Sequence, residues 1–171
     1  MRSLTLIGMP GSGKSAVGKI VASRMGWNFI DTDKWMEDRY GTRLQALIDR
    51  VGDDSFRRLE EETILALATA GQTVISTGGS VVYSDAAMEH LASLSTILFL
   101  DVPMDAIRSH IDAEAPRGIV GMKEGGLEEL YQDRKPRYER YAELTLHVGS
   151  ETPEELASDI VTELKYLHKH L

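Results

Sequence analysis

The chain has 171 residues, of which 42% are hydrophobic and 27% charged, values typical of one globular domain and not of a disordered protein. Its 27 acidic residues outnumber the 19 lysines and arginines, and the net charge of −8 argues against a nucleic-acid binder. The absence of cysteine excludes disulfides and cysteine nucleophiles, and no apolar run is long enough to span a membrane. We therefore expect a soluble, cytoplasmic protein that binds neither nucleic acid nor membrane.

Short apolar strands alternate with amphipathic helices along the chain. A first helix over about residues 14–25 and a last helix from about residue 153 place their apolar residues on one face. This alternation predicts an α/β fold with a mostly parallel sheet and helices on both faces. The expected strands span residues 4–7, 27–30, 73–76, 96–100 and 144–148.

Two segments interrupt the alternation. The run from 33 to 70 has a helical pattern throughout and is too long for one crossover, so part of it should project beyond the sheet as an insert, which we place at about 33–60. The segment 113–126 contains four glycines and a proline, and loops of this length often act as mobile lids. We therefore expect a single domain, residues 1–171, with a helical insert and a lid.

Residues 8–15 read Gly-Met-Pro-Gly-Ser-Gly-Lys-Ser and match the phosphate-loop pattern G-x-x-x-x-G-K-[ST]. The motif follows the first strand and opens the first helix, which is the context that nucleotide binding requires. Its glycines allow successive backbone N–H groups to converge on phosphate oxygens. Lys14 would bridge the β- and γ-phosphates, and Ser15 would offer its hydroxyl to Mg²⁺. The expected nucleotide contacts from this segment are Gly11, Ser12, Gly13, Lys14, Ser15 and Ala16.

Acidic residues end two of the expected strands. Asp101 is interpreted as the end of a strand beside a helix N-terminus, because Val102 and Pro103 follow it at once. Asp31 and Asp33 end the second strand, at the sheet edge where ligands of open α/β sheets bind. With the chain extended here, we expect one of these carboxylates to reach a metal's water shell while the other meets an acceptor molecule. The alternative interpretation is a pair of helix N-cap residues.

Three further motifs follow in order: F-R-x-x-E at residues 56–60, a diglycine at 78–79 and R-x-P-x-Y at 134–138. Together with the phosphate loop and the Asp-Thr-Asp at 31–33, they make the whole chain resemble the shikimate kinase family. The resemblance implies a P-loop kinase fold with a five-stranded parallel sheet of order 2-3-1-4-5. It also implies MgATP-dependent phosphorylation of a hydroxyl group on a small carboxylic acid, with shikimate, converted to shikimate 3-phosphate, as the first choice.

The resemblance also assigns residues to the acceptor. Asp33 would hold and orient the acceptor hydroxyls, and Arg57 and Arg134 would bind its carboxylate. Gly78 and Gly79 would let backbone N–H groups approach it. An arginine clamp suits a carboxylate because the planar guanidinium gives paired hydrogen bonds. The alternative for both arginines is a solvated helix face.

On the nucleotide side, the resemblance places Asp31 near Mg²⁺ through water. It brings Arg117 from the lid to the transferring phosphoryl group, so that Lys14, Arg117 and the aspartate at position 33 form the expected catalytic group. Arg108 would lie against adenine, and Pro153 would end the adenine loop. The expected ligands are ATP or ADP with Mg²⁺ and a small hydroxy acid, bound by a monomer.

Two departures from the family lie on the acceptor side. Ser80 stands where the family has a third glycine, and the lid reads Arg-Gly-Ile-Val at 117–120 where the family has R-P-L-L. Three hypotheses stay open: a shikimate kinase, a relative that phosphorylates another hydroxylated acid such as homoserine, and a non-catalytic nucleotide-binding regulator. The complete phosphate-binding machinery argues against the regulator, since a pure binder does not need the lid arginine.

Overall fold

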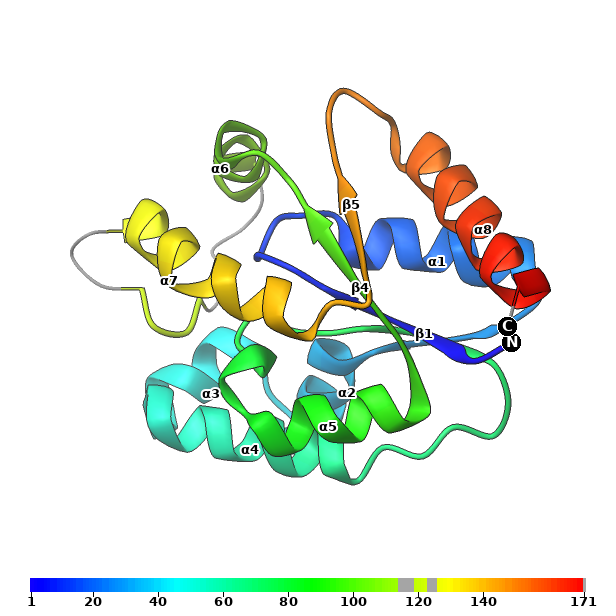
Figure 1. Ribbon diagram of the computed structural model, residues 1–171. Coiled ribbons are helices and arrows are strands. Elements are labelled where there is room, and N and C mark those ends of the chain that lie inside the picture. Colours follow the sequence, from blue (N-terminus) through cyan, green and yellow to red (C-terminus); the bar gives the residue numbers. More distant parts are fainter. Residues whose placement is uncertain (114–118, 123–125, 171) are drawn as a thin grey trace.

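A five-stranded parallel sheet forms the centre of the computed structural model, which describes residues 1–113, 119–122 and 126–170 (Figure 1). The strand order is β2-β3-β1-β4-β5, and every neighbouring pair is parallel. The sheet order expected from the family resemblance is thus confirmed. The strands are β1 Ser3–Ile7, β2 Asn28–Asp31, β3 Thr73–Ser76, β4 Ser95–Asp101 and β5 Leu144–His147.

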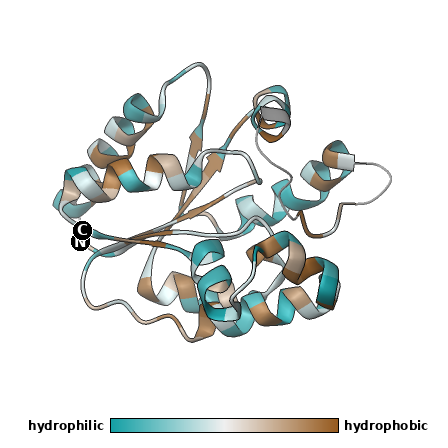
Figure 2. Ribbon diagram, turned by 180° about the vertical axis from the view of Figure 1, so that it is seen from behind, coloured by the Kyte–Doolittle hydropathy of each residue, from teal (hydrophilic) through white to brown (hydrophobic). Residues whose placement is uncertain are grey.

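Helices cover the two faces of the sheet. Helices α1 and α8 pack against each other on one face, and α4, α5, the short 3₁₀ helix η1 and α7 pack together on the other (Figure 1). The strands are largely hydrophobic, whereas each helix mixes hydrophobic and hydrophilic residues (Figure 2). The helices are α1 Lys14–Met25, α2 Thr32–Tyr40, α3 Leu44–Val51, α4 Asp53–Leu65, η1 Val81–Tyr83, α5 Asp85–Leu94, α6 Met104–Ala113, α7 Gly126–Tyr141 and α8 Pro153–His170.

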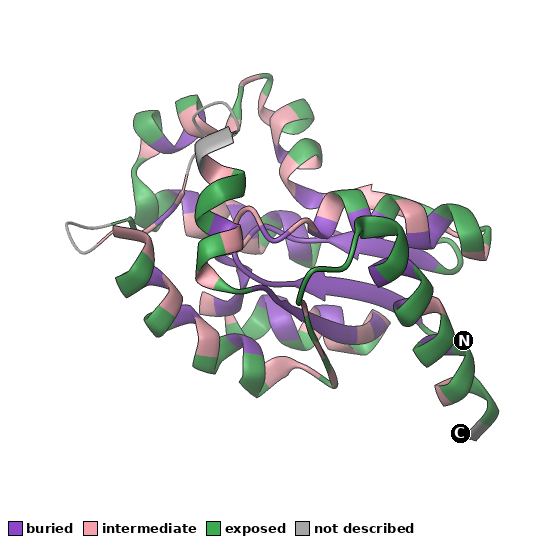
Figure 3. Cartoon of the chain, turned by 90° about the horizontal axis from the view of Figure 1, so that it is seen from above, coloured by how far each residue is buried: buried purple, intermediate pink, exposed green. Residues whose placement is uncertain are grey.

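The register of the central strands sets the position of the functional residues. Strands β1 and β3 are buried along their whole length (Figure 3), as expected for strands covered on both faces. Leu6 of β1 lies beside Ser76 of β3, and Ser76 lies beside Asp31 of β2. The carboxyl ends of these three strands therefore meet at one edge of the sheet, where the phosphate loop follows β1.

Three helices, α2, α3 and α4, connect β2 to β3 where a single crossover would suffice. They have a small hydrophobic core of their own, separate from the main core around the sheet. Val120, from the glycine-rich segment, belongs to this small core, so that segment packs on the insert. The buried members of the small core are Met36, Leu47, Ile48, Phe56 and Val120.

The strand and helix boundaries agree with the sequence pattern where local signals are strong. The expected first helix and third strand coincide with α1 and β3, whereas β4 is one residue longer at each end. The expectation of an extended chain through Asp33 is wrong, because α2 begins at Thr32. The Asp31 carboxylate caps this helix by accepting hydrogen bonds from the backbone N–H groups of Asp33 and Lys34, at 3.1 and 3.2 Å. None of the helices in the described ranges combines the length and the apolar character needed to cross a membrane.

Candidate active site

The phosphate loop lies between β1 and α1, and its glycines adopt backbone conformations that other residues rarely take. The φ angles of Gly11 and Gly13 are 75° and 83°. A Cβ atom on Gly11 would also lie 3.0 Å from Cγ1 of Ile111. His110 donates a hydrogen bond from Nδ1 to the Gly11 carbonyl at 2.8 Å. Helix α6 therefore rests on the loop at the position where the sequence predicts phosphate binding.

The ammonium group of Lys14 is held by the loop itself. Its Nζ donates to the carbonyl oxygens of Gly8 and Met9 at 2.9 and 2.8 Å, and to Oγ of Ser12 at 3.2 Å. The residue is only 7% exposed. A cation this well ordered loses little further conformational freedom when an anionic ligand arrives.

Three oxygen-bearing side chains meet where β2 and β3 end. The Ser15 hydroxyl donates to Oδ2 of Asp31 at 2.6 Å and lies 3.1 Å from Oγ of Ser76. Hydroxyl and carboxylate oxygens are the ligands that Mg²⁺ prefers, and Mg²⁺ is usually held by one or two such groups together with phosphate oxygens and water. The described residues contain no group of three or more His, Cys, Asp or Glu side chains that could hold a metal ion, so a metal here would depend on nucleotide phosphates. The residues present fit a magnesium–nucleotide complex.

Two carboxylates face Gly78 on the acceptor side. A Cβ atom on Gly78 would lie 2.6 Å from Oε1 of Glu60 and 2.7 Å from Oδ1 of Asp33, so a larger residue would require these carboxylates to move. Glu60 is 3% exposed and accepts a hydrogen bond of 2.6 Å from the Ser80 hydroxyl. Burial raises the pKa of Glu60 to about 7; the Ser80 hydrogen bond opposes this shift, and the nearby Asp33 adds to it. The hydroxyl of Ser80, which stands where the family resemblance would place a third glycine, thus binds Glu60.

Arg134 is the largest fully buried side chain and is 1% exposed, which excludes the solvated helix face for this arginine. A Cβ atom on Gly79 would lie 2.8 Å from its Nη1 and 2.9 Å from Cδ of Pro10. Gly79 therefore lies between the phosphate loop and Arg134. The Gly79 carbonyl accepts a 2.7 Å hydrogen bond from the buried Tyr138 hydroxyl, and Arg134 Nη2 donates to the Val120 carbonyl at 2.6 Å.

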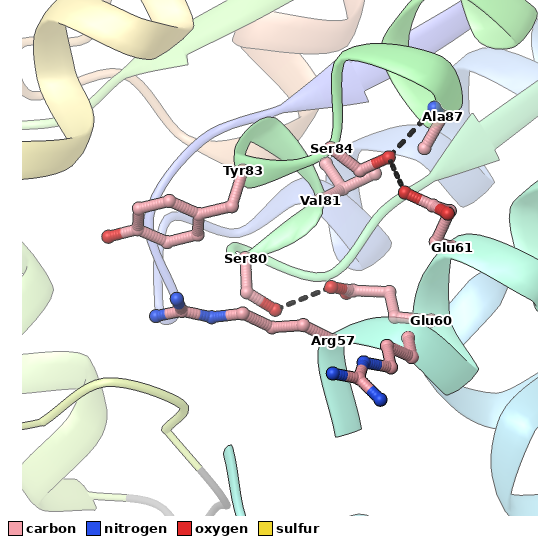
Figure 4. A pocket seen from close by; sticks show the side chains of 9 residues that line it. Arg57, Glu60, Glu61, Ser80, Val81, Tyr83, Ser84 and Ala87 are labelled. Carbon is pink, nitrogen blue, oxygen red and sulfur yellow. Dashed lines mark hydrogen bonds between the residues drawn. The ribbon is translucent and has the colours of Figure 1, made fainter. Parts of the chain in front are cut away.

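Arg57 approaches the same region from α4. Its guanidinium carbon lies 4.1 Å from the centre of the Tyr83 ring, and the two side chains face each other in Figure 4. Arg134 reaches the same ring, at 5.4 Å, and donates from Nε to the Tyr83 hydroxyl at 3.4 Å. Nε of Arg57 is buried without a hydrogen-bond partner among the described residues. The structure thus brings together two arginines that are far apart in the sequence.

A cavity of about 240 Å³ borders this region between α4, η1 and α5. Its wall includes Arg57, Glu60, Ser80 and Tyr83 but not Asp33, so the cavity adjoins the acceptor side and does not coincide with it. Figure 4 shows these side chains around it. The lining residues are Arg57, Arg58, Glu60, Glu61, Ser80, Val81, Tyr83, Ser84 and Ala87.

The remaining residues expected from the sequence are exposed or lie outside the described residues. Arg108 of α6 and Pro153, the first residue of α8, are both exposed. Arg117 lies outside the described residues, and so does most of the expected lid. Ala16 is exposed in the first turn of α1.

Asp101 ends β4, as expected, and α6 begins at Met104. The buried carboxylate of Asp101 lies 3.2 Å from Nζ of Lys135 and 3.0 Å from Nδ1 of His147. It therefore ties α7 to the ends of β4 and β5, one residue away from Arg134.

Three site residues were missed by reasoning from the sequence. Glu60 is part of the F-R-x-x-E motif but received no role, because its burial depends on packing. Ser76 ends a buried strand beside the phosphate loop, a position that could have been recognised. Tyr83 offered no local signal, since it is an isolated aromatic residue in a short turn.

Comparison with known proteins relates the chain to one family. The family model described as shikimate kinase matches residues 10–165. The chain belongs to the shikimate kinase family. A curated shikimate kinase from Thermodesulfovibrio yellowstonii is 33% identical over 169 residues, covering 98% of this chain and 97% of the relative. One from Paracidovorax citrulli is 38% identical over 148 residues, covering 84% and 81%.

Solved structures show the same fold. A shikimate kinase from Acinetobacter baumannii in complex with shikimate has a TM-score of 0.87 at 24% identity, covering 97% of this chain and 94% of that one. A shikimate kinase from Aquifex aeolicus has a TM-score of 0.81 at 27% identity, covering 95% and 96%. The chain is thus a member of an ATP-dependent kinase family in both sequence and fold.

Proposed function

We propose that the chain is a shikimate kinase, which transfers the γ-phosphoryl group of MgATP to a hydroxyl group of shikimate and releases ADP and shikimate 3-phosphate. The observation that carries this proposal is the position of Gly79 between Pro10 of the phosphate loop and the buried Arg134. A phosphate-binding loop and a carboxylate-binding cation thus share one edge of the sheet. This is the arrangement that a kinase of a small hydroxy acid needs.

On the nucleotide side, Lys14 and the N-terminus of α1 bind the phosphates. Mg²⁺, when bound, would neutralise charge on the phosphate oxygens, held by Ser15 directly and by Asp31 through water. The hydrogen bond from Ser15 to Asp31 already orders these two ligands in the protein. Charge on the transferring phosphoryl group is met by these groups and by Lys14, which exchanges at least one of its hydrogen bonds within the loop for a phosphate oxygen.

On the acceptor side, Arg57 and Arg134 bind the carboxylate of shikimate, and Asp33 orients the hydroxyl that attacks. A new bond forms between this hydroxyl oxygen and the γ-phosphorus as the bond to ADP breaks, and the hydroxyl proton passes by way of the Asp33 carboxylate to solvent. The transition state of phosphoryl transfer is loose, so orientation by Asp33 contributes more than proton abstraction. Because Gly78 and Gly79 lack side chains, their backbone N–H groups can approach the acceptor closely.

The segment 113–126 acts as the lid in this proposal and brings Arg117 to the phosphoryl group. The contact between Val120 and Arg134 supports this role, because it joins the segment to an acceptor-binding arginine. A closed lid excludes water and so suppresses hydrolysis of ATP.

An ADP-release assay with shikimate, homoserine, gluconate or no acceptor tests the proposal. We expect the highest kcat/KM with shikimate and a slow background without an acceptor. Turnover with homoserine alone would reject shikimate as the substrate but would still agree with Arg57 and Arg134 as the residues that bind the acceptor carboxylate. No acceptor-dependent release with any of the three would contradict the proposed activity.

A further inference from the structure

Tyr83 lies at the centre of a group of three arginines. The guanidinium carbons of Arg57, Arg137 and Arg134 lie 4.1, 4.8 and 5.4 Å from the centre of its ring. The Tyr83 hydroxyl donates to Asp133 and accepts from Nε of Arg134. One aromatic side chain from η1 thus contacts side chains of both α4 and α7.

Arg57 and Arg134 need a neighbouring group that offsets their positive charge. No carboxylate oxygen lies within 4 Å of a nitrogen of Arg57 or Arg134 in the described part of the chain, although Glu60 lies close enough to attract both. Like charges held close together repel one another, and a partly protonated carboxyl group offsets this repulsion only in part. The face of an aromatic ring carries negative electrostatic potential and attracts a guanidinium, more strongly where water is excluded.

A ring is a suitable partner for a cation that must bind an anionic ligand. A carboxylate partner would occupy the N–H donors and would have to be displaced, whereas a ring face attracts the guanidinium and leaves donors in its plane for other acceptors. Nε of Arg57, which is buried without a hydrogen-bond partner, is such a donor. The arrangement therefore keeps hydrogen-bonding capacity for a carboxylate.

We propose that Tyr83 is a positioning residue for the acceptor carboxylate: its ring holds the guanidinium groups of Arg57 and Arg134 so that both can bind the same ligand. This inference rests on the proposed function for the identity of the acceptor. The ring makes the larger contribution, because it contacts both arginines, and the hydroxyl adds the weaker 3.4 Å contact to Arg134.

Steady-state kinetics of Y83F and Y83L separate the ring from the hydroxyl. Y83L should raise the KM for shikimate about tenfold, which corresponds to about 1.4 kcal/mol, while kcat and the KM for ATP stay near the wild-type values. Y83F keeps the ring and should raise the KM for shikimate less than about threefold. An unchanged KM for shikimate in Y83L, or an equal loss in Y83F, would overturn the role of the ring.

Tyr141 offers a matched control. It is half-buried like Tyr83, its ring lies 5.2 Å from the Arg140 guanidinium carbon, and its hydroxyl is bonded to Asp85. We expect Y141L to keep the wild-type KM for shikimate. A rise as large as that in Y83L would mean that loss of any such tyrosine perturbs the site, and the proposal would fail.

A second readout does not depend on the acceptor. The Nε–Hε proton resonances of Arg57 and Arg134, assigned through the R57K and R134K variants, should be displaced by the ring current in the wild type and Y83F and return toward ordinary values in Y83L. Unshifted resonances in the wild type would overturn the arrangement even if the enzyme is active. Shifted resonances in a protein that does not phosphorylate shikimate would instead reject the proposed function and keep the positioning role.

Discussion

Glu60→Gln should change how stability depends on pH, because Glu60 is a buried carboxyl group with an unusual pKa. Burial raises its pKa from 4.5 to about 7 in the folded protein. Between these values the folded protein holds a proton that the unfolded chain has released, so the free energy of unfolding falls as the pH rises. The difference corresponds to a loss of about 3 kcal/mol between about pH 4 and pH 8. Glutamine keeps the size of the side chain and an oxygen that accepts the Ser80 hydrogen bond, but it does not titrate.

Urea denaturation at a series of pH values measures this effect. The E60Q variant should lose less stability than the wild type as the pH rises from about 5 to about 8, and the difference should approach 3 kcal/mol. Because the Ser80 hydrogen bond lowers the pKa of Glu60, the S80A variant should extend the wild-type decline to higher pH. Glu62, exposed on the same helix, provides the control: E62Q should follow the wild-type curve. Parallel curves for the wild type and E60Q would show that the pKa of Glu60 is not raised in the folded protein.

Two further substitutions test the phosphate side of the site by steady-state kinetics. Lys14→Ala should remove most turnover, because the ammonium group neutralises charge on the transferring phosphoryl group; a variant that keeps more than about half of the wild-type kcat would reject this role. Arg117→Ala should lower kcat more than it weakens ATP binding, if the lid arginine acts mainly in the closed complex. Equal losses in both quantities would place Arg117 in the resting nucleotide site.

Local patterns predicted the fold well, because the features that set it are local. Apolar runs fixed the approximate strands, and the phosphate loop marked the junction of β1 and α1. The ends of strands were less predictable, since they depend on partners distant in sequence: β4 begins one residue earlier than expected, at Ser95, which lies beside Ser3 of β1. Likewise, the sequence did not show that Asp31 would cap a helix and bind Ser15 at the same time.

The sequence predicted the site residues whose role follows from their residue type and motif. It was less informative where burial and neighbouring side chains determine what a residue does. Arg134 stood out through its motif, but its burial and its contact with Val120 depend on the packing of α7 against η1 and of Val120 on the insert. The pKa of Glu60 depends on burial and on Ser80 and Asp33, which converge only in the fold. Tyr83 could not be found from the sequence, because its importance comes from three arginines on two other helices.

In the proposed reaction, this protein transfers a phosphoryl group to the acceptor that Arg57 and Arg134 bind. The most direct measurement is the amount of phosphorylated shikimate, determined by ³¹P NMR or mass spectrometry, against the ADP released in the same reaction. We predict equal amounts of both products for the wild type, and much less phosphorylated shikimate at the same shikimate concentration for R134A. ADP released without phosphorylated shikimate, or equal product formation by R134A, would contradict the account.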